Sequence, residues 1–130
     1  MAHPNVEVLR RLDEAMLKED METFFAQYTN DVVVHIPGKS KLAGTYKGLD
    51  KLQDLFGRFM EAAGEYTFEN HSYLADDEHG VILQHGTMTK GAKTLNLIET
   101  FVSHFRGGKV SEFWYQCDDQ AALDAWIGAK

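Results

Sequence analysis

The sequence is poor in cysteine and in positive charge. Its single cysteine, Cys117, can form no disulfide within the chain, so nothing suggests a secreted disulfide scaffold. The 13 lysines and arginines are outnumbered by 20 aspartates and glutamates, which gives a formal net charge of −7. Nucleic acid binding needs a continuous basic surface, so this balance argues against a nucleic acid partner.

Long apolar runs are also missing. No uninterrupted apolar segment approaches the roughly 20 residues that a membrane helix needs, and the first residues do not combine a cationic stretch with an apolar run. We therefore expect a cytoplasmic protein without a membrane partner. The 44% hydrophobic fraction of the 130 residues is enough for one core. We predict a single domain over residues 1–130.

The first part of the chain has helical periodicity. Asn5 is a candidate N-cap for a helix that extends to about Lys18, because leucines and a methionine recur at helical spacing after it. Asp20 is the candidate N-cap of a second helix, whose apolar face is expected to end at Tyr28. Two short helices therefore come first.

A strand, a loop and a long helix are expected next. Residues 32–36 are apolar and mostly β-branched, and the strand must end near Pro37, which has no amide proton to donate. A basic loop then leads through two glycines to residues 49–63, which carry the clearest helical stripe in the chain. Gly64 is well placed to end this helix.

From Tyr66 onward the hydrophobic period changes from 3.6 to 2. This pattern predicts four strands joined by three tight turns, which form an antiparallel meander. Asp118 or Asp119 is the candidate N-cap of a closing helix that ends at Gly128. The predicted strands cover residues 66–75, 81–89, 94–105 and 110–117.

This order of elements predicts an α+β domain, because the sheet must bury one face against the helices. Strands of about ten residues twist strongly, so the antiparallel sheet is expected to curve round the long helix. The open end of such a curved sheet would not be filled completely. We therefore predict a pocket there, lined by alternate residues of each strand and by the loop from Pro37 to Tyr46.

Three stretches, residues 35–48, 108–114 and 118–122, combine with this order to give a family resemblance. The chain resembles the nuclear transport factor 2-like superfamily and, more narrowly, its SnoaL-like branch, which is related to polyketide cyclases and ketosteroid isomerases. The resemblance implies a cystatin-like, cone-shaped half-barrel with N-terminal helices. It also implies a homodimer. From the predicted pocket we expect a small hydrophobic ligand, and we expect no cofactor.

Glu99 is the carboxylate best suited to chemistry. It lies in mid-strand on the same face as Leu97 and Phe101. Apolar surroundings disfavour the charged form of an acid, which suits it to proton transfer. The position resembles that of the strand acid that binds the oxyanion in ketosteroid isomerases. The alternative is an inverted or edge strand, in which Glu99 is solvated or paired with a lysine.

The other groups of the isomerase site are missing. The position that resembles the general base of that family is Ile36 here, and the position of its helix tyrosine falls near Leu12. Neither side chain can move a proton or donate to an enolate oxygen. Steroid isomerisation is therefore not expected.

His35 and Asp118 are the other catalytic candidates. Imidazole titrates near neutrality and His35 adjoins the loop, but a structural histidine that bonds a backbone carbonyl is the alternative. Asp118 resembles the acid that some cyclases of this branch place at the end of the strand, whereas an N-cap role is the simpler explanation. No pair of residues has the helical spacing of a zinc site, so we expect no metal.

Ligand-binding candidates include residues from both faces of the last strand. Phe113 and Tyr115 share one face and Trp114 lies on the other; the isomerase resemblance favours the first pair in the pocket, and a shift of one residue would reverse it. The full set of candidates is Tyr46, Phe56, His85, Leu97, Phe101, Phe113, Trp114 and Tyr115.

Two functions fit these observations. The first is a cofactor-independent acid–base enzyme, an isomerase, cyclase, dehydratase or epoxide-opening enzyme, acting on a small and largely apolar molecule. The second is a module that binds a hydrophobic ligand without chemistry, or a dimeric module of another role. The missing isomerase groups support the second function.

Overall fold

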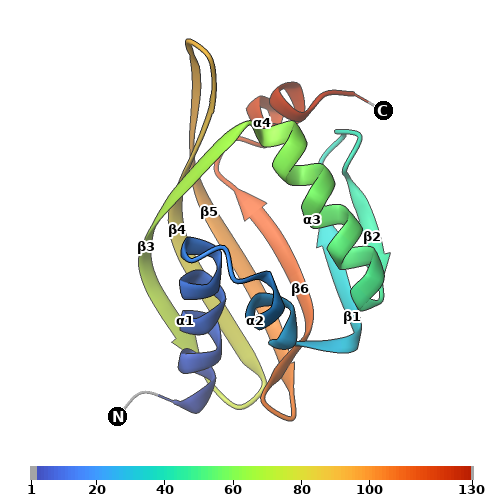
Figure 1. The fold of residues 1–130 in the computed structure, drawn as a ribbon, viewed down its shortest axis with the longest axis vertical. Helices are drawn as coiled ribbons and strands as arrows, with labels where there is room; N and C mark the ends of the chain where they lie inside the picture. The colour runs from blue at the N-terminus through green and yellow to red at the C-terminus, as the bar shows by residue number, and fades with distance from the viewer. Residues whose placement is uncertain (1–2, 130) are drawn as a thin grey trace.

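The computed structural model describes residues 3–129, which form four helices and one six-stranded sheet (Figure 1). The predicted α+β class with a curved sheet is confirmed. The helices are α1 (Pro4–Leu17), α2 (Met21–Ala26), α3 (Leu49–Ala63) and α4 (Gln120–Ile127). The strands are β1 (Tyr28–Ile36), β2 (Gly44–Lys47), β3 (Glu65–Ala75), β4 (His79–Lys90), β5 (Lys93–Arg106) and β6 (Lys109–Cys117).

The strands lie in the order β2-β1-β6-β5-β4-β3. The predicted meander, β3 to β6, is antiparallel throughout, and its last strand continues the sheet by pairing with β1 in parallel. The sheet is therefore mixed. Strand β2, in the predicted basic loop, was not expected; it pairs with β1 in antiparallel fashion, from Val33 opposite Lys47 to Ile36 opposite Gly44.

The ends of the first two helices differ from the predicted ones. The side chain of His3, rather than that of Asn5, caps α1, where it accepts a hydrogen bond of 3.1 Å from the Asn5 backbone nitrogen. Asp20 caps α2 as predicted. Helix α2 ends at Ala26, and Tyr28 begins β1 instead of continuing the helical stripe.

The helices α1, α2 and α3 lie on one side of the curved sheet (Figure 1). Leu9 and Leu12 of α1 and Leu52 and Leu55 of α3 are buried beneath them, and each buried leucine contributes about 2 kcal/mol of hydrophobic stabilisation. The alternation of the strands sends every second side chain to this concave side. Within residues 3–129, no helix has both the length and the apolar character needed to cross a membrane.

Candidate functional site

A cavity of about 160 Å³ lies between the concave side of the sheet and the helices. Every helix and every strand except β2 contributes to its wall, so the cavity sits at the centre of the fold. Most of the wall is apolar. Six phenylalanine rings line it: Phe24, Phe56, Phe59, Phe68, Phe101 and Phe113.

Glu99 lies in this wall and has no exposed surface. Its strand, β5, is flanked by β4 and β6, so the carboxyl is neither at a sheet edge nor in solvent. The alternation along β5 places Leu97 and Phe101 on the same side as Glu99.

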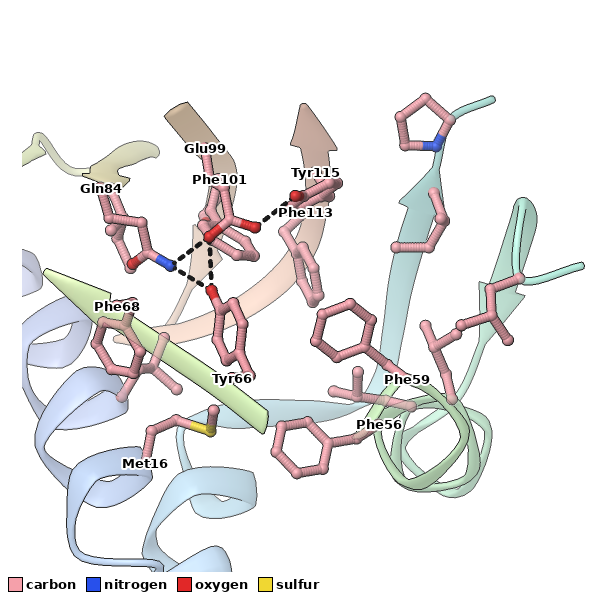
Figure 2. Close-up of a pocket in the computed structure, with 18 of the residues that line it drawn as sticks. Met16, Phe56, Phe59, Tyr66, Phe68, Gln84, Glu99, Phe101, Phe113 and Tyr115 are labelled. Carbon is pink, nitrogen blue, oxygen red and sulfur yellow. Dashed lines mark hydrogen bonds between the residues drawn. The ribbon is translucent and has the colours of Figure 1, made fainter. Parts of the chain in front are cut away.

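Three donors from three strands converge on the Glu99 carboxyl (Figure 2). The Tyr66 hydroxyl donates to Oε1 at 2.5 Å, and the Gln84 amide nitrogen donates to the same oxygen at 3.1 Å. The Tyr115 hydroxyl donates to Oε2 at 2.5 Å. No lysine, arginine or histidine of the described chain lines the cavity, so no cationic side chain of the wall accompanies these three donors.

The two tyrosines are held in their neutral form. Burial raises the pKa of Tyr66 and of Tyr115, and the adjacent charge of Glu99 raises both further. Both phenols therefore keep their protons in the neutral pH range and act as donors to Glu99. They are not bases.

Gln84 faces Glu99 across the ladder between β4 and β5. Its side chain is 3% exposed, and its amide nitrogen donates to both Glu99 and the Tyr66 hydroxyl. The amide oxygen, Oε1, is buried and has no hydrogen-bond partner. Buried polar atoms without partners are uncommon in folded proteins, so this acceptor is an unusual feature of the buried face of β4.

Asp13 is a second buried carboxyl in the cavity wall. It comes from α1 and accepts hydrogen bonds from the Tyr73 hydroxyl at 2.8 Å and from the Asn70 amide at 3.1 Å, both at Oδ2. Burial raises the pKa of Asp13, and the two hydrogen bonds counteract this rise in part.

Of the residues predicted from the sequence, five line the cavity: Glu99, Phe56, Phe101, Phe113 and Tyr115. The candidates His35 and Trp114 lie on the opposite, convex side of the sheet. There the His35 ring stacks on Trp114 with centroids 4.8 Å apart, and its Nε2 lies 2.6 Å from Glu112 Oε2. Both rings line a separate, more open depression beside β1 and β2.

The other four candidates also lie outside the cavity wall. Asp118 follows β6, and its Oδ1 accepts a hydrogen bond from the Ile98 backbone at 2.9 Å; the neighbouring Asp119 caps α4. The Tyr46 hydroxyl donates to a backbone carbonyl at 2.6 Å. Leu97 is buried in the core, and His85 shares the convex side with Ile98, its ladder partner.

Sequence reasoning missed three polar residues of the site: Asp13, Tyr66 and Gln84. Gln84 carries the same signal as Glu99, because it alternates with Ile82 and Met88 on a buried face. Tyr66 alternates likewise with Phe68. Asp13 follows Leu12 of the apolar stripe of α1, and no role was assigned to it from the sequence.

The arrangement holds the carboxyl of Glu99 in place by three hydrogen bonds in the wall of a largely apolar cavity. Within residues 3–129, no group of three or more histidine, cysteine, aspartate or glutamate side chains is arranged to hold a metal ion.

Solved structures with the same fold were found. Bal32a, from a soil-derived mobile gene cassette, is 27% identical, with 97% of this chain and 98% of that chain covered and a TM-score of 0.88. A protein of unknown function with a cystatin-like fold from Xanthomonas campestris is 22% identical, with 98% and 99% covered and a TM-score of 0.88. TerC, co-crystallised with polyporic acid, is 19% identical, with 96% and 98% covered and a TM-score of 0.84.

No curated protein was found to match the chain. The sequence profile of the SnoaL-like domain matches residues 9–113, which include most of α1, all of α2 and α3, and the strands from β1 to the middle of β6. This range contains Asp13, Tyr66, Gln84 and Glu99, so the match covers most of the cavity wall. The chain therefore belongs to the SnoaL-like domain family, as the resemblance of its motifs predicted.

Proposed function

We propose that this protein binds a small, largely apolar molecule in the central cavity and that Glu99 transfers a proton to or from it. The reaction class is that of a cofactor-independent isomerase, cyclase, dehydratase or epoxide-opening enzyme. The observation that carries the proposal is the fully buried Glu99 carboxyl in an aromatic cavity, held by Tyr66, Gln84 and Tyr115.

The geometry around Glu99 supports a role in proton transfer. A catalytic acid or base must be held at a defined position, and two tyrosines and an amide hold both carboxyl oxygens here. The apolar rings around it exclude water, which strengthens any interaction between the carboxyl and a bound molecule. The carboxyl is therefore ordered before a ligand arrives.

Steroid isomerisation is not part of the proposal. The positions that resemble the base and the helix tyrosine of ketosteroid isomerases are Ile36 and Leu12, and both line the cavity as apolar wall. A carbonyl oxygen at that end of the cavity would meet no donor from these two residues.

The second candidate is ligand binding without chemistry. It is favoured by the same three hydrogen bonds, because both oxygens of the carboxyl already have partners within the protein. Among the solved structures of this fold, TerC was co-crystallised with polyporic acid, an organic small molecule. The two candidates share the cavity and differ only in whether the ligand is changed.

The test uses Glu99→Gln, which keeps the size of the side chain and removes its ability to carry a proton. Wild type and variant are incubated with a metabolite extract of the source cells, and the extract is compared by mass spectrometry. We expect a compound consumed by the wild type to be left by Glu99→Gln. Glu112→Gln, on the convex side, is the matched control and is expected to act as wild type.

Two outcomes separate the candidates. Equal turnover by wild type and Glu99→Gln would remove Glu99 from catalysis. If native mass spectrometry of protein purified from its source finds a retained small molecule that the protein leaves unchanged, the non-catalytic function is supported instead.

We also propose a homodimer formed through the convex side of the sheet. Trp114 and Val102 are ladder partners there, and Leu74 and Ile98 are 54% and 43% exposed. Burial of such apolar side chains against a second copy would stabilise a symmetric pair. Sedimentation velocity over a wide concentration range tests this, and a monomer throughout would contradict it.

A further inference from the structure

The hydrogen-bonding atoms around Glu99 are used on one another (Figure 2). The hydroxyl protons of Tyr66 and Tyr115 both go to the Glu99 carboxyl, and the Gln84 amide donates to Glu99 and to the Tyr66 oxygen. Glu99 has no exposed surface, and the free oxygen of Gln84 is sealed from solvent. A bound molecule therefore finds its first hydrogen-bond partners elsewhere in the cavity wall.

Tyr28 brings a hydroxyl without a partner into that wall. Its ring packs against those of Phe24 and Phe113, which also line the cavity, with centroids 5.5 and 5.9 Å apart. Tyr28 is 6% exposed, and no hydrogen bond joins its hydroxyl to the described chain. The buried side-chain atoms of that chain that lack both a partner and accessible surface are Thr29 Oγ1 and Gln84 Oε1. The Tyr28 hydroxyl therefore remains accessible.

Asp13 brings a second free atom into the same wall. Leu12, Asp13 and Met16 share the inner face of α1, and all three line the cavity. The carboxyl receives its hydrogen bonds from Tyr73 and Asn70 at Oδ2, which leaves Oδ1 without a partner in the described chain. Asp13 is 8% exposed, and its Oδ1 is not one of the sealed atoms. This oxygen is therefore accessible as well.

The two free atoms are neighbours. Burial raises the pKa of Tyr28, and the charge of Asp13 raises it further, which places the two groups within electrostatic range. The phenol keeps its proton and can donate it to a hydrogen bond. Tyr28 also contacts Phe113, the ladder partner of Ser103, and Ser103 lies four residues from Glu99 along β5, about 13 Å away. The pair is therefore separate from the Glu99 hydrogen bonds.

We propose that the ligand of this cavity is a small single-ring molecule with a hydroxyl group, which accepts a hydrogen bond from Tyr28 and donates one to Asp13 Oδ1. The proposal rests on the proposed function and names its ligand class. One donor beside one acceptor matches a hydroxyl, which offers both. A carbonyl or ether oxygen would satisfy Tyr28 and leave the Asp13 carboxylate without a partner. The ring of the ligand then extends toward Tyr66 and Glu99.

The size of the cavity sets the probes. A cavity of roughly 150 Å³ in another protein takes benzene, so a single substituted ring suits the 160 Å³ here. Benzyl alcohol, benzaldehyde and toluene share one ring and differ in the polar group. Their dissociation constants are measured by calorimetry on the full chain. A mildly alkaline pH is used, because burial raises the pKa of Asp13 and the carboxyl must be ionised to accept.

Benzyl alcohol is expected to bind about tenfold more tightly than benzaldehyde, which is the value of one net hydrogen bond. Benzaldehyde that binds as tightly or more tightly would overturn the proposal. If toluene binds in that case, the cavity is still a ligand site, and the proposed function stands without this ligand class. If none of the three probes binds, the proposed function fails as well.

Tyr28→Phe removes the hydroxyl and no hydrogen bond of the described chain, so the variant should fold as the wild type does. Benzyl alcohol should bind to it about tenfold more weakly, whereas the affinity for toluene should not fall. Tyr46→Phe is the matched control, because the Tyr46 hydroxyl bonds to a backbone carbonyl and does not line the cavity. An unchanged affinity for benzyl alcohol in Tyr28→Phe would overturn the assignment.

Asp13→Asn tests the acceptor. Because Tyr73 and Asn70 donate to Oδ2, an amide at this position keeps its oxygen there and places its nitrogen where Oδ1 was. A donor then replaces the acceptor, so the preference for benzyl alcohol over benzaldehyde should be lost. A purely structural role would change stability and leave this preference, so an unchanged preference in folded Asp13→Asn would overturn the role of Asp13. If the variant does not fold, the wild-type order and Tyr28→Phe decide.

Discussion

Gly86 lies directly against the carboxyl of Glu99. A Cβ atom placed on Gly86 would be 2.1 Å from Glu99 Oε1 and 2.6 Å from Glu99 Cδ, distances at which atoms overlap. The backbone of Gly86 is not in the left-handed region, so its conformation does not require glycine. Glycine is needed at this position because a side chain would collide with Glu99. The glycine in β4 makes the room in which the buried acid of β5 is held.

The first prediction concerns this contact. Gly86→Ala should displace the Glu99 carboxyl from Tyr66 and Tyr115, lower the free energy of unfolding by about 2 kcal/mol, and weaken ligand binding. Urea denaturation measures the change in stability, and calorimetry with benzyl alcohol measures the change in binding. Gly57→Ala is the control, because a Cβ at Gly57 in α3 meets nothing within 4 Å and should add about 0.5–1 kcal/mol of stability. A Gly86→Ala protein with wild-type stability and binding would contradict the account.

The second prediction compares the two tyrosines. Tyr115 is the donor to Glu99 Oε2, whereas Oε1 receives both Tyr66 and Gln84. Tyr115→Phe therefore leaves a buried oxygen with no donor and should cost about 3 kcal/mol, against about 1 kcal/mol for Tyr66→Phe. Denaturation curves of the two variants measure the two losses in the free energy of unfolding. A larger loss for Tyr66→Phe than for Tyr115→Phe would show that the hydrogen bonds do not hold the carboxyl as described.

The third prediction concerns pH and Asp13. Burial raises the pKa of Asp13 above its ordinary value of 3.8, so between the two values the folded state binds more protons than the unfolded state. Stability is therefore lost as the pH rises from 3.8 through the raised pKa. Asp13→Asn cannot titrate, so its stability relative to wild type should rise over this window and then level off. Unfolding free energies at a series of pH values measure this difference, and a difference that is constant with pH would refute the buried titration.

Much of the fold could be predicted from periodicity alone, because long strands and α3 show their pattern over many residues. Strand β2 could not, since its four residues are too few for a period and its existence depends on pairing with β1. Tyr28 fitted the helical stripe of α2 by spacing, but its side chain is buried at the start of β1. Tertiary pairing outweighed local pattern at both places.

The site was predictable only where one polar residue stood out on an apolar face. Glu99 did so, and the same reading of β4 would have added Gln84, which alternates with Ile82. His35 and Trp114 lie on the convex side of the sheet, together with Glu112. The side that a strand residue faces depends on the register, and a shift of one residue reverses it, so composition could not exclude these two candidates. Gly86 has no side chain to suggest a role, and only the three-dimensional contact with Glu99 identifies it.

The most direct test of the central claim is an NMR titration of isotope-labelled protein with benzyl alcohol. The account predicts that backbone shifts concentrate at Tyr66, Gln84 and Glu99, which surround the polar end of the cavity (Figure 2). The depression beside His35 and Trp114 should show none. Shifts confined to that depression, or none at saturating probe, would contradict the assignment of the central cavity as the functional site.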